Sequence, residues 1–152
     1  MRTGPPSPPG SFHRTIPSDR DAVDRTCLEL RGFLAESEAA RAGFAIELVA
    51  RELLVNAVLH GNRLQREKQA LVDLRIGSRW VTLRVGDKGE GFDWRQQRRR
   101  PAPSFDATHG RGLIIAGEYG ARVTFNRTGN SVTVWFQKPA ARARSRCPKA
   151  TP

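Results

Sequence analysis

Residues 52–61 read ELLVNAVLHG and lie in the most apolar helical stretch of the chain. Three polar side chains, Glu52, Asn56 and His60, recur there at every fourth position. Each residue turns a helix by about 100°, so groups four positions apart drift by only about 40° and share one stripe. A carboxylate and a carboxamide are costly to bury among Leu and Val unless something satisfies them. The stripe therefore indicates either ordinary pairing with neighbouring groups or a lined pocket, and for three groups in register the two interpretations carry equal weight.

This stripe carries groups suited to metal and proton chemistry. The oxygen of Asn56 is a hard ligand of the kind that Mg²⁺ prefers. Glu52, one helical turn away, can accept a proton or hold a metal-bound water. His60 is a further candidate that can orient neighbouring groups, although a histidine in this setting is more typical of a structural role.

The segment that precedes this helix predicts a strand followed by another helix. Apolar and polar residues alternate over 11–16, which predicts an edge strand that ends at Pro17. Ser18 followed by Asp21 resembles a helix cap. An apolar repeat at i, i+4, i+7 and i+11 then predicts an amphipathic helix over about 21–37.

The helix that contains ELLVNAVLHG is predicted over about 41–60, is apolar on most sides, and ends at Gly61-Asn62 in the manner of a C-cap. The rest of the chain predicts two hairpins, a long loop and a short helix: strands over 71–76 and 80–85, a loop over 86–112, a helix that opens at 113–116, and strands over 122–125 and 132–136. This order of elements predicts an α+β domain, with a mainly antiparallel sheet and helices on one face.

The aromatic residues of the C-terminal half follow strand patterns. Trp80, Trp135 and Phe136 lie in predicted strand patterns, which is more typical of core residues than of stacking platforms. Trp94 follows a loop motif and is placed to cover a ligand.

Two glycine motifs accompany the polar stripe. Asp87 ends a predicted strand and is followed by Gly89 and Gly91, an arrangement that lets the backbone approach a flat ligand closely. Gly110 and Gly112 lie at the entry to the predicted short helix, where free N–H groups favour phosphate oxygens. Either motif alone is also compatible with an ordinary turn or a flexible loop.

The three motifs in this order, E-x-x-x-N-A-x-x-H-G, D-x-G-x-G-F-D and G-R-G-L, resemble the histidine-kinase-like (GHKL) ATPase superfamily with its Bergerat nucleotide fold, a two-layer sandwich. Within it, the chain is most similar to the small anti-sigma-factor serine/threonine kinases. The resemblance covers about residues 12–138 and identifies the long loop, about 93–111, as the family's ATP lid.

The resemblance implies a role for each matching residue. Asn56 would coordinate the Mg²⁺ that bridges the phosphates of ATP, and Glu52 would be the catalytic base that activates the incoming hydroxyl. Asp87 would accept a hydrogen bond from the adenine amino group, with Gly89 and Gly91 shaping the adenine pocket. Such roles suit phosphoryl transfer, in which positioning and charge neutralisation do most of the work.

The lid end and the last strand complete the comparison. The residues that match the family's nucleotide-binding lid end are Gly110, Arg111, Gly112 and Leu113. The sequence departs from the family at Thr108, where some members carry an arginine that reaches the terminal phosphate. It also departs at Val132, because many relatives place a threonine there, whereas this chain has Thr133 one residue later as a further candidate.

The resemblance implies a cytoplasmic anti-sigma factor that binds ATP and Mg²⁺. It would hold a sigma factor inactive and phosphorylate a serine or threonine of an anti-anti-sigma (STAS) partner, and it could pair with a second copy of itself. Neither a membrane nor a sequence-specific nucleic acid is expected as a partner. The alternative is a non-catalytic, nucleotide-gated module that binds protein partners, which the departure at Thr108 favours. A nucleic-acid-binding protein is a third possibility that rests on charge alone.

Charge and composition set the domain limits. The 152 residues are 38% apolar with 14 glycines, which is enough for one globular domain. The net charge of +11 is uneven, because residues 21–92 hold 11 acidic and 11 basic side chains whereas residues 93–138 hold 3 and 8. We expect a disordered Pro-rich leader over 1–10, the ATPase domain over 11–138 and a disordered basic tail over 139–152.

Other features fit a reduced, intracellular setting. The two cysteines form no disulfide framework, and no His/Cys cluster has zinc spacing. The N-terminus lacks the apolar stretch of a secretion signal, and no apolar run approaches the roughly 20 residues that span a bilayer.

Overall fold

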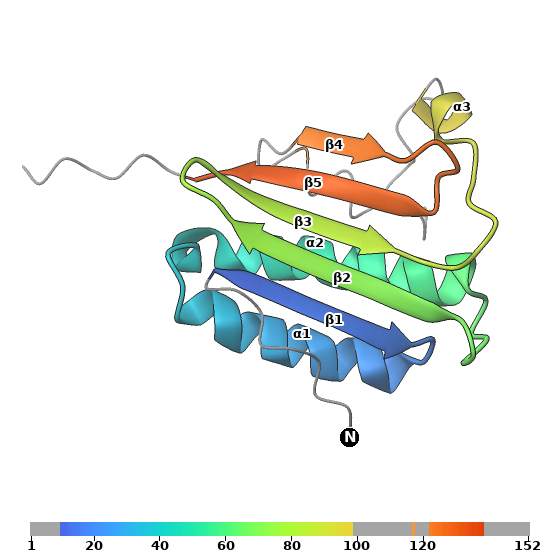
Figure 1. The fold of residues 1–152 in the computed structure, drawn as a ribbon, viewed down its shortest axis with the longest axis horizontal. Helices are drawn as coiled ribbons and strands as arrows, with labels where there is room; N and C mark the ends of the chain where they lie inside the picture. The colour runs from blue at the N-terminus through green and yellow to red at the C-terminus, as the bar shows by residue number, and fades with distance from the viewer. Residues whose placement is uncertain (1–9, 99–116, 118–121, 139–152) are drawn as a thin grey trace, which may run out of the picture.

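The computed structural model describes residues 10–98, 117 and 122–138, which form two layers (Figure 1). The elements in chain order are β1 (Ser11–Pro17), α1 (Arg20–Ala35), the 3₁₀ turn η1 (Ala40–Ala42), α2 (Gly43–Asn56), the π-helical turn η2 (Ala57–Gly61), β2 (Gln69–Ile76), β3 (Trp80–Gly86), α3 (Trp94–Arg98), β4 (Arg122–Phe125) and β5 (Ser131–Gln137).

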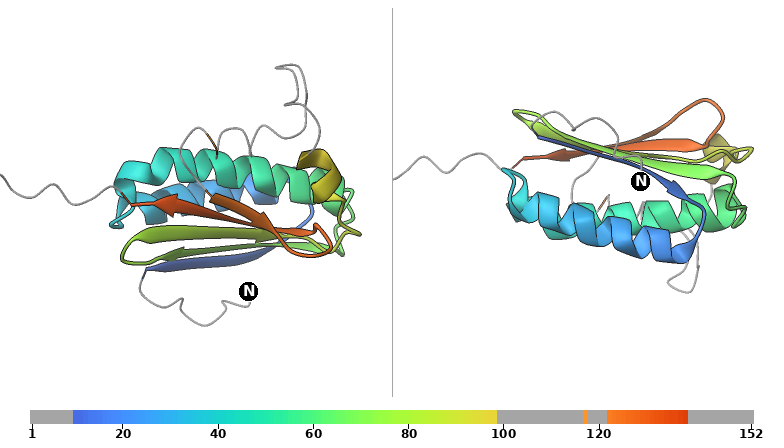
Figure 2. Two further views of the ribbon diagram at one scale, coloured as in Figure 1. Left: turned by 90° about the horizontal axis from the view of Figure 1, so that it is seen from above. Right: turned by 60° about the horizontal axis from the view of Figure 1, so that its bottom comes forward.

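The five strands form one open antiparallel sheet in the order β1-β2-β3-β5-β4. Leu83 in the central strand lies opposite Leu74 on one side and Val134 on the other. Both long helices, α1 and α2, pack on the same face of this sheet (Figure 2). The predicted α+β class, with a mainly antiparallel sheet and helices on one face, is confirmed.

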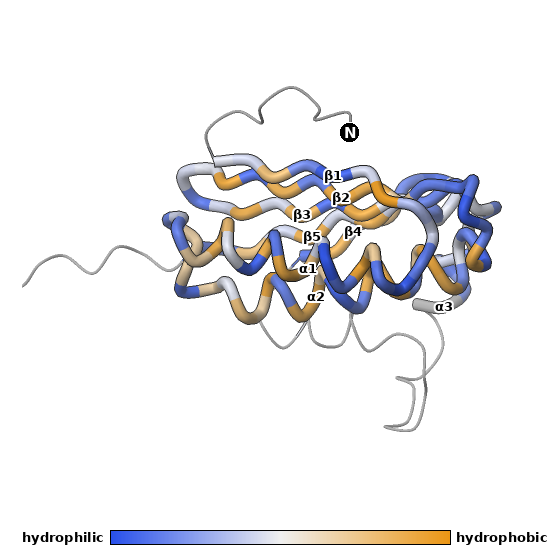
Figure 3. The backbone as a smooth tube through the Cα atoms, turned by 90° about the horizontal axis from the view of Figure 1, so that it is seen from below, coloured by the Kyte–Doolittle hydropathy of each residue, from blue (hydrophilic) through white to orange (hydrophobic). Residues whose placement is uncertain are grey.

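The core lies between the helices and the sheet. Alternate strand residues such as Val72, Leu74 and Leu83 are fully buried and pack in one cluster with Ile46 and Val49 of α2. Figure 3 shows apolar residues recurring between hydrophilic ones along the strands and along both long helices. The period of two in the strands thus selects the face that the helices cover.

Helix α1 begins one residue away from the predicted cap. The N-cap is Asp19, whose carboxylate accepts a hydrogen bond from the backbone N–H of Ala22 at 2.7 Å. Ser18 is instead fully buried and its hydroxyl donates to the carbonyl of Lys68 at 2.5 Å. A buried serine that ties β1 to a distant loop is unavailable as a cap, so the neighbouring aspartate takes that role.

Helix α2 ends in a turn of a different helical type. The α-helix stops at Asn56 and continues as the π-helical turn to Gly61. The predicted end at Gly61-Asn62 is confirmed, because Gly61 is the last residue of the turn and Asn62 is its C-cap. The cap lacks the left-handed conformation usual at such ends, and the positive φ angles fall instead on Arg63 and Leu64, at 52° and 58°. π-turns of this kind are frequent at functional sites, and the cavity described below opens beside this one.

Two predictions about burial are also wrong. Trp80 is 40% exposed and Trp135 is only partly buried, because both alternate with core residues and lie on the sheet face away from the helices; Phe136, by contrast, is buried as predicted. Phe44 near the start of α2 is 72% exposed, so this helix is not buried on most sides along its whole length.

Several predictions fall outside the described residues. These are the leader over 1–9, most of the lid, the short helix at 113–116 and the tail over 139–152. Within the described part of the chain, no helix is both long enough and apolar enough to cross a membrane.

Candidate functional site

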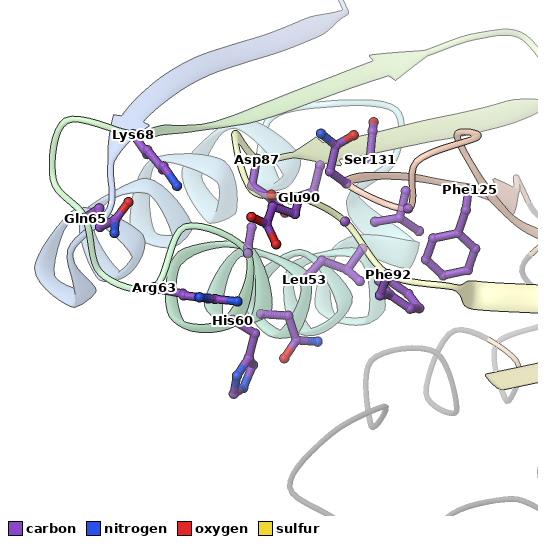
Figure 4. Close-up of a pocket in the computed structure, with 18 residues that line it drawn as sticks. Leu53, His60, Arg63, Gln65, Lys68, Asp87, Glu90, Phe92, Phe125 and Ser131 are labelled. Atoms are coloured by element: carbon purple, nitrogen blue, oxygen red, sulfur yellow. The ribbon is translucent and has the colours of Figure 1, made fainter. Parts of the chain in front are cut away.

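A cavity of about 480 Å³ opens where the end of α2 meets the loops that follow β3 and β4 (Figure 4). Its walls come from α2 and η2, from the loop before β2, from the end of β3 and from the β4–β5 hairpin. Phe92 and Phe125 lie side by side at one end, and Gln65 and Lys68 lie at the other. A cavity of this volume, partly apolar with a few converging polar groups, is typical of a small-molecule site.

Asp87 is the half-buried acid of this cavity. One of its carboxylate oxygens accepts a hydrogen bond from the backbone N–H of Gly89 at 2.7 Å, and its own N–H donates to the carbonyl of Asn130 at 2.9 Å. Burial raises the pKa of the Asp87 carboxyl, while the Gly89 hydrogen bond and the positive charge of Lys68 act in the opposite direction. The second oxygen has no hydrogen-bond donor among the described residues and can therefore accept one from a ligand.

Glycines bring three backbone segments close together around Asp87. A Cβ atom on Gly61 would collide with the Asp87 carboxylate, and one on Gly89 would collide with the Gly61 carbonyl oxygen. Gly91 has a φ of +78°, and a Cβ there would collide with the Thr128 carbonyl oxygen. The D-x-G-x-G motif is thus required by packing between chain segments, in addition to any approach of a ligand.

Asn62 connects these segments, although the sequence interpretation gave it only a capping role. The side chain is fully buried; its amide donates to the Ser18 hydroxyl at 2.7 Å and its oxygen accepts from the Lys88 backbone N–H at 2.8 Å. It therefore joins the start of α1 to the loop that carries Asp87. No periodic pattern marks such a residue, because its partners lie 44 and 26 positions away along the chain.

We expect Asn62→Ala to lower the free energy of unfolding by about 2–4 kcal/mol, because it leaves the Lys88 backbone N–H without its acceptor and the buried Ser18 hydroxyl without its donor. Urea denaturation followed by circular dichroism measures this loss. The exposed neighbour Gln65 offers the control, since Gln65→Ala should change the free energy of unfolding by no more than about 0.5 kcal/mol. Equal stability of the two variants would contradict the bridging role of Asn62.

Aromatic side chains form the apolar end of the site. Phe92 meets Phe125 edge to face, with ring centroids 5.5 Å apart, and both line the cavity. Trp94 stacks on Phe125 with ring centroids 5.6 Å apart, and its indole N–H donates to the Asn126 carbonyl at 3.0 Å. Trp94 is not among the lining residues, so its role is to hold Phe125 and the start of α3 rather than to cover the cavity.

The structure brings some of the predicted site residues to the cavity and leaves others outside it. Four of them line it: Asn56, His60, Asp87 and Gly91. Glu52 lies on α2 one turn before Asn56; it is half-buried and does not line the cavity. Gly89 does not line the cavity either, and instead packs against the backbone of Gly61. The lid-end residues lie outside the described part of the chain: Gly110, Arg111, Gly112 and Leu113.

The last strand presents Val132 to the cavity instead of Thr133. Val132 is 8% exposed and lines the cavity, whereas Thr133 alternates with it and so lies on the opposite sheet face. The hydroxyl of the lining residue Ser131 accepts a hydrogen bond from Arg84 at 3.2 Å. Neither Thr133 nor Ser131 therefore brings a free hydroxyl to the cavity in this strand.

The loop between η2 and β2 contributes lining residues that the sequence interpretation missed. Arg63, Gln65 and Lys68 all face the cavity from this loop. Arg63 takes a left-handed backbone conformation that is uncommon outside glycine and asparagine, and such conformations cluster at functional sites. The sequence feature that could have indicated this loop is the concentration of polar residues directly after the polar stripe.

The residues present fit a nucleotide with Mg²⁺. The free oxygen of Asp87 suits an exocyclic amino group, the phenylalanine pair suits a planar base, and Arg63 and Lys68 supply positive charge for an anion. No group of three or more His, Cys, Asp or Glu that could hold a metal occurs in the described ranges. Mg²⁺ needs no such group, because it keeps several waters and takes phosphate oxygens along with one or two protein ligands, for which the Asn56 amide oxygen is suited.

The stability of the nucleotide-free protein is expected to depend on the charge of Asp87. Because its pKa in the folded protein is raised above the ordinary value of 3.8, its favourable contribution is present below that value and is lost as the pH rises through the raised pKa. Asp87→Asn removes the buried charge, so the stability of this variant relative to the parent should increase between about pH 3 and pH 7.

Urea denaturation at several pH values measures this difference. Asp87→Ala is the matched control: it should follow the same pH trend from a lower baseline, since it also leaves the Gly89 N–H without an acceptor. A difference between Asp87→Asn and the parent that does not change with pH would contradict the burial effect.

Comparison with known proteins agrees with this geometry. A family model described as a histidine kinase-like ATPase domain matches residues 16–138, which is most of the chain. A search of curated proteins finds no match.

Proposed function

Because the chain belongs to the histidine kinase-like ATPase domain family, we propose that it binds ATP with Mg²⁺ in the cavity beside α2 and transfers the terminal phosphoryl group to a protein serine or threonine. The observation that carries the proposal is the convergence of Asn56 and Asp87 on one cavity from positions 31 residues apart in the sequence.

The cavity supports nucleotide binding through residues of different kinds. Asp87 would accept the adenine amino group, with the base beside Phe92 and Phe125. Asn56 would hold Mg²⁺, which when bound neutralises the phosphate charge that develops during transfer. Asp87 would thus mark the end of the site that holds the base, and Asn56 the end that holds the phosphates.

Glu52 is the proposed base for the transfer step. It lies one turn from Asn56 on the same helix, outside the lined cavity, where an incoming hydroxyl could meet it. The hydroxyl oxygen would bond to the γ-phosphorus as the bond to the β-phosphate oxygen breaks, and the carboxylate of Glu52 would take the hydroxyl proton.

The proposed biological role is an anti-sigma factor. In this role the protein sequesters a sigma factor and phosphorylates an anti-anti-sigma partner of the STAS type, acting in the cytoplasm and pairing with a second copy. The support for this finer assignment is the motif set E-x-x-x-N-A-x-x-H-G, D-x-G-x-G-F-D and G-R-G-L, which resembles that branch of the family.

One observation favours a second candidate, a nucleotide-gated binding module without transfer activity. Val132 lines the cavity at the position where many relatives carry a threonine, and the neighbouring hydroxyls do not replace it. Such a module would use ATP to choose between protein partners.

The deciding experiment recovers proteins bound to the purified chain from its native lysate, with and without ATP and Mg²⁺, and then incubates each one with the chain and γ-labelled ATP. Label on a serine or threonine of a partner is the expected result. ATP-dependent capture without transfer of label would instead establish the binding module, and loss of nucleotide dependence altogether would overturn both.

A further inference from the structure

None of the described helices covers the outer face of the sheet (Figure 2). This face carries an unusual group of aromatic and basic residues. Six of the residues that strand alternation places on it are here called the outer patch: Arg75, Trp80, Thr82, Arg84, Arg122 and Trp135.

The strand register makes the patch continuous. Arg75, Thr82, Trp135 and Arg122 are successive cross-strand partners on β2, β3, β5 and β4, and so form one row across the sheet. Trp80 and Arg84 flank Thr82 on β3. Diagonal neighbours in an antiparallel sheet lie roughly 7–8 Å apart, so Trp80 and Trp135 are close enough to act on successive parts of one ligand.

The charge on this face is predominantly positive. Arg75, Arg84 and Arg122 are basic, and Asp73, which pairs with Arg75 at 3.3 Å, is the one carboxylate among the described strand residues that share this face. The guanidinium of Arg122 lies 5.8 Å from the centre of the Trp135 ring, near the limit of a cation–π contact, and so can turn toward a phosphate at little cost.

We infer that the outer patch binds single-stranded nucleic acid without base-sequence preference, independently of the nucleotide cavity. Exposed aromatic rings accept bases by stacking, and arginines between them meet the backbone phosphates. A sheet face with interleaved tryptophan and arginine offers both contacts at once. An acidic protein segment would use the arginines but would leave the two tryptophans without a role.

The test titrates a labelled 15-nucleotide oligothymidylate with the full-length protein and follows fluorescence anisotropy between about 50 and 200 mM salt. The variant Trp80→Thr/Trp135→Thr should bind at least about tenfold more weakly at the higher salt, because stacking is less sensitive to salt than charge attraction is. The variant Arg84→Gln/Arg122→Gln should have a shallower dependence of affinity on salt.

Matched controls lie on the helix layer. Phe44→Ala removes a more exposed aromatic side chain, and Arg25→Gln/Arg41→Gln removes the same charge. Both should bind the oligonucleotide with the parental affinity, apart from the general effect of charge on the arginine pair. Thermal unfolding followed by circular dichroism confirms that each variant is folded, and the single variant Trp80→Thr, at a residue 40% exposed, replaces the double variant if that one does not fold.

Three results would overturn the inference. The first is parental affinity in the tryptophan variants. The second is an equal change of salt dependence in the two arginine pairs, which would indicate attraction to the whole basic chain. The third is tighter binding of a 15-residue polyglutamate peptide than of the oligonucleotide, which would assign the patch to an acidic protein partner.

Discussion

Glu52→Ala is expected to slow phosphoryl transfer to the protein substrate by about 10²–10⁴-fold, the usual contribution of a general base. The affinity for ATP should stay at the parental value, because Glu52 does not line the cavity and a base acts on the incoming hydroxyl rather than on the bound nucleotide. Single-turnover transfer from γ-labelled ATP measures the rate, and a fluorescent ATP analogue measures the affinity.

Two further variants sharpen this test. Glu52→Gln keeps the size and hydrogen-bonding capacity of the side chain but cannot take a proton, so it should be as slow as Glu52→Ala. Glu67→Ala removes an exposed carboxylate from the loop before β2 and should transfer at the parental rate. A fast Glu52→Gln variant would show that the residue positions the substrate instead of accepting its proton.

Asn56→Ala is expected to remove the Mg²⁺-dependent part of ATP binding, with a loss of affinity of at least about tenfold. Asn56 is the last residue of α2 and lines the cavity, so its amide oxygen is the described group best placed to reach a metal ion held by the phosphates. Titration with ATP in the presence of Mg²⁺, and again with the metal chelated, separates the two parts of the affinity.

Asn56→Asp is the matched variant for this prediction. It retains an oxygen ligand at the same position and should keep the response to Mg²⁺. If Asn56→Ala bound ATP with an unchanged response to Mg²⁺, the metal role would belong to another residue, whereas the role of Asp87 in holding the base would be unaffected.

The sheet and the helix packing were predictable because they follow from periodicity. Strand alternation at Val72, Leu74 and Leu83 and the helical repeat of α1 each select one apolar face, and those faces have few ways to meet. The same alternation could not assign Trp80 and Trp135 to the correct face, since both faces of β3 and β5 carry large apolar residues. A period identifies the two faces of a strand but not the one that the helices cover.

The candidate site was predictable in part, for a different reason. The residues that line the cavity from α2 and from the end of β3 stand out because polar groups interrupt apolar patterns at Asn56 and Asp87. Asn62 and the loop at Arg63 give no such signal, because their roles depend on hydrogen bonds to distant segments and on a backbone conformation that no local residue preference favours.

The close contacts of Gly61, Gly89, Gly91 and Gly129 have a consequence for how this sequence can change. Each contact joins backbone, or the Asp87 carboxylate, to the position where a Cβ atom would lie. Trimming a neighbouring side chain therefore cannot make room for a larger residue at Gly89, Gly91 or Gly129, because their obstacles are carbonyl groups that every residue carries. In a library of random variants, Gly89, Gly91 and Gly129 should tolerate almost no substitution, and no second-site suppressor should restore them. Variants at Gly61 should instead be rescued by substitution of Asp87, which also removes the acid of the site.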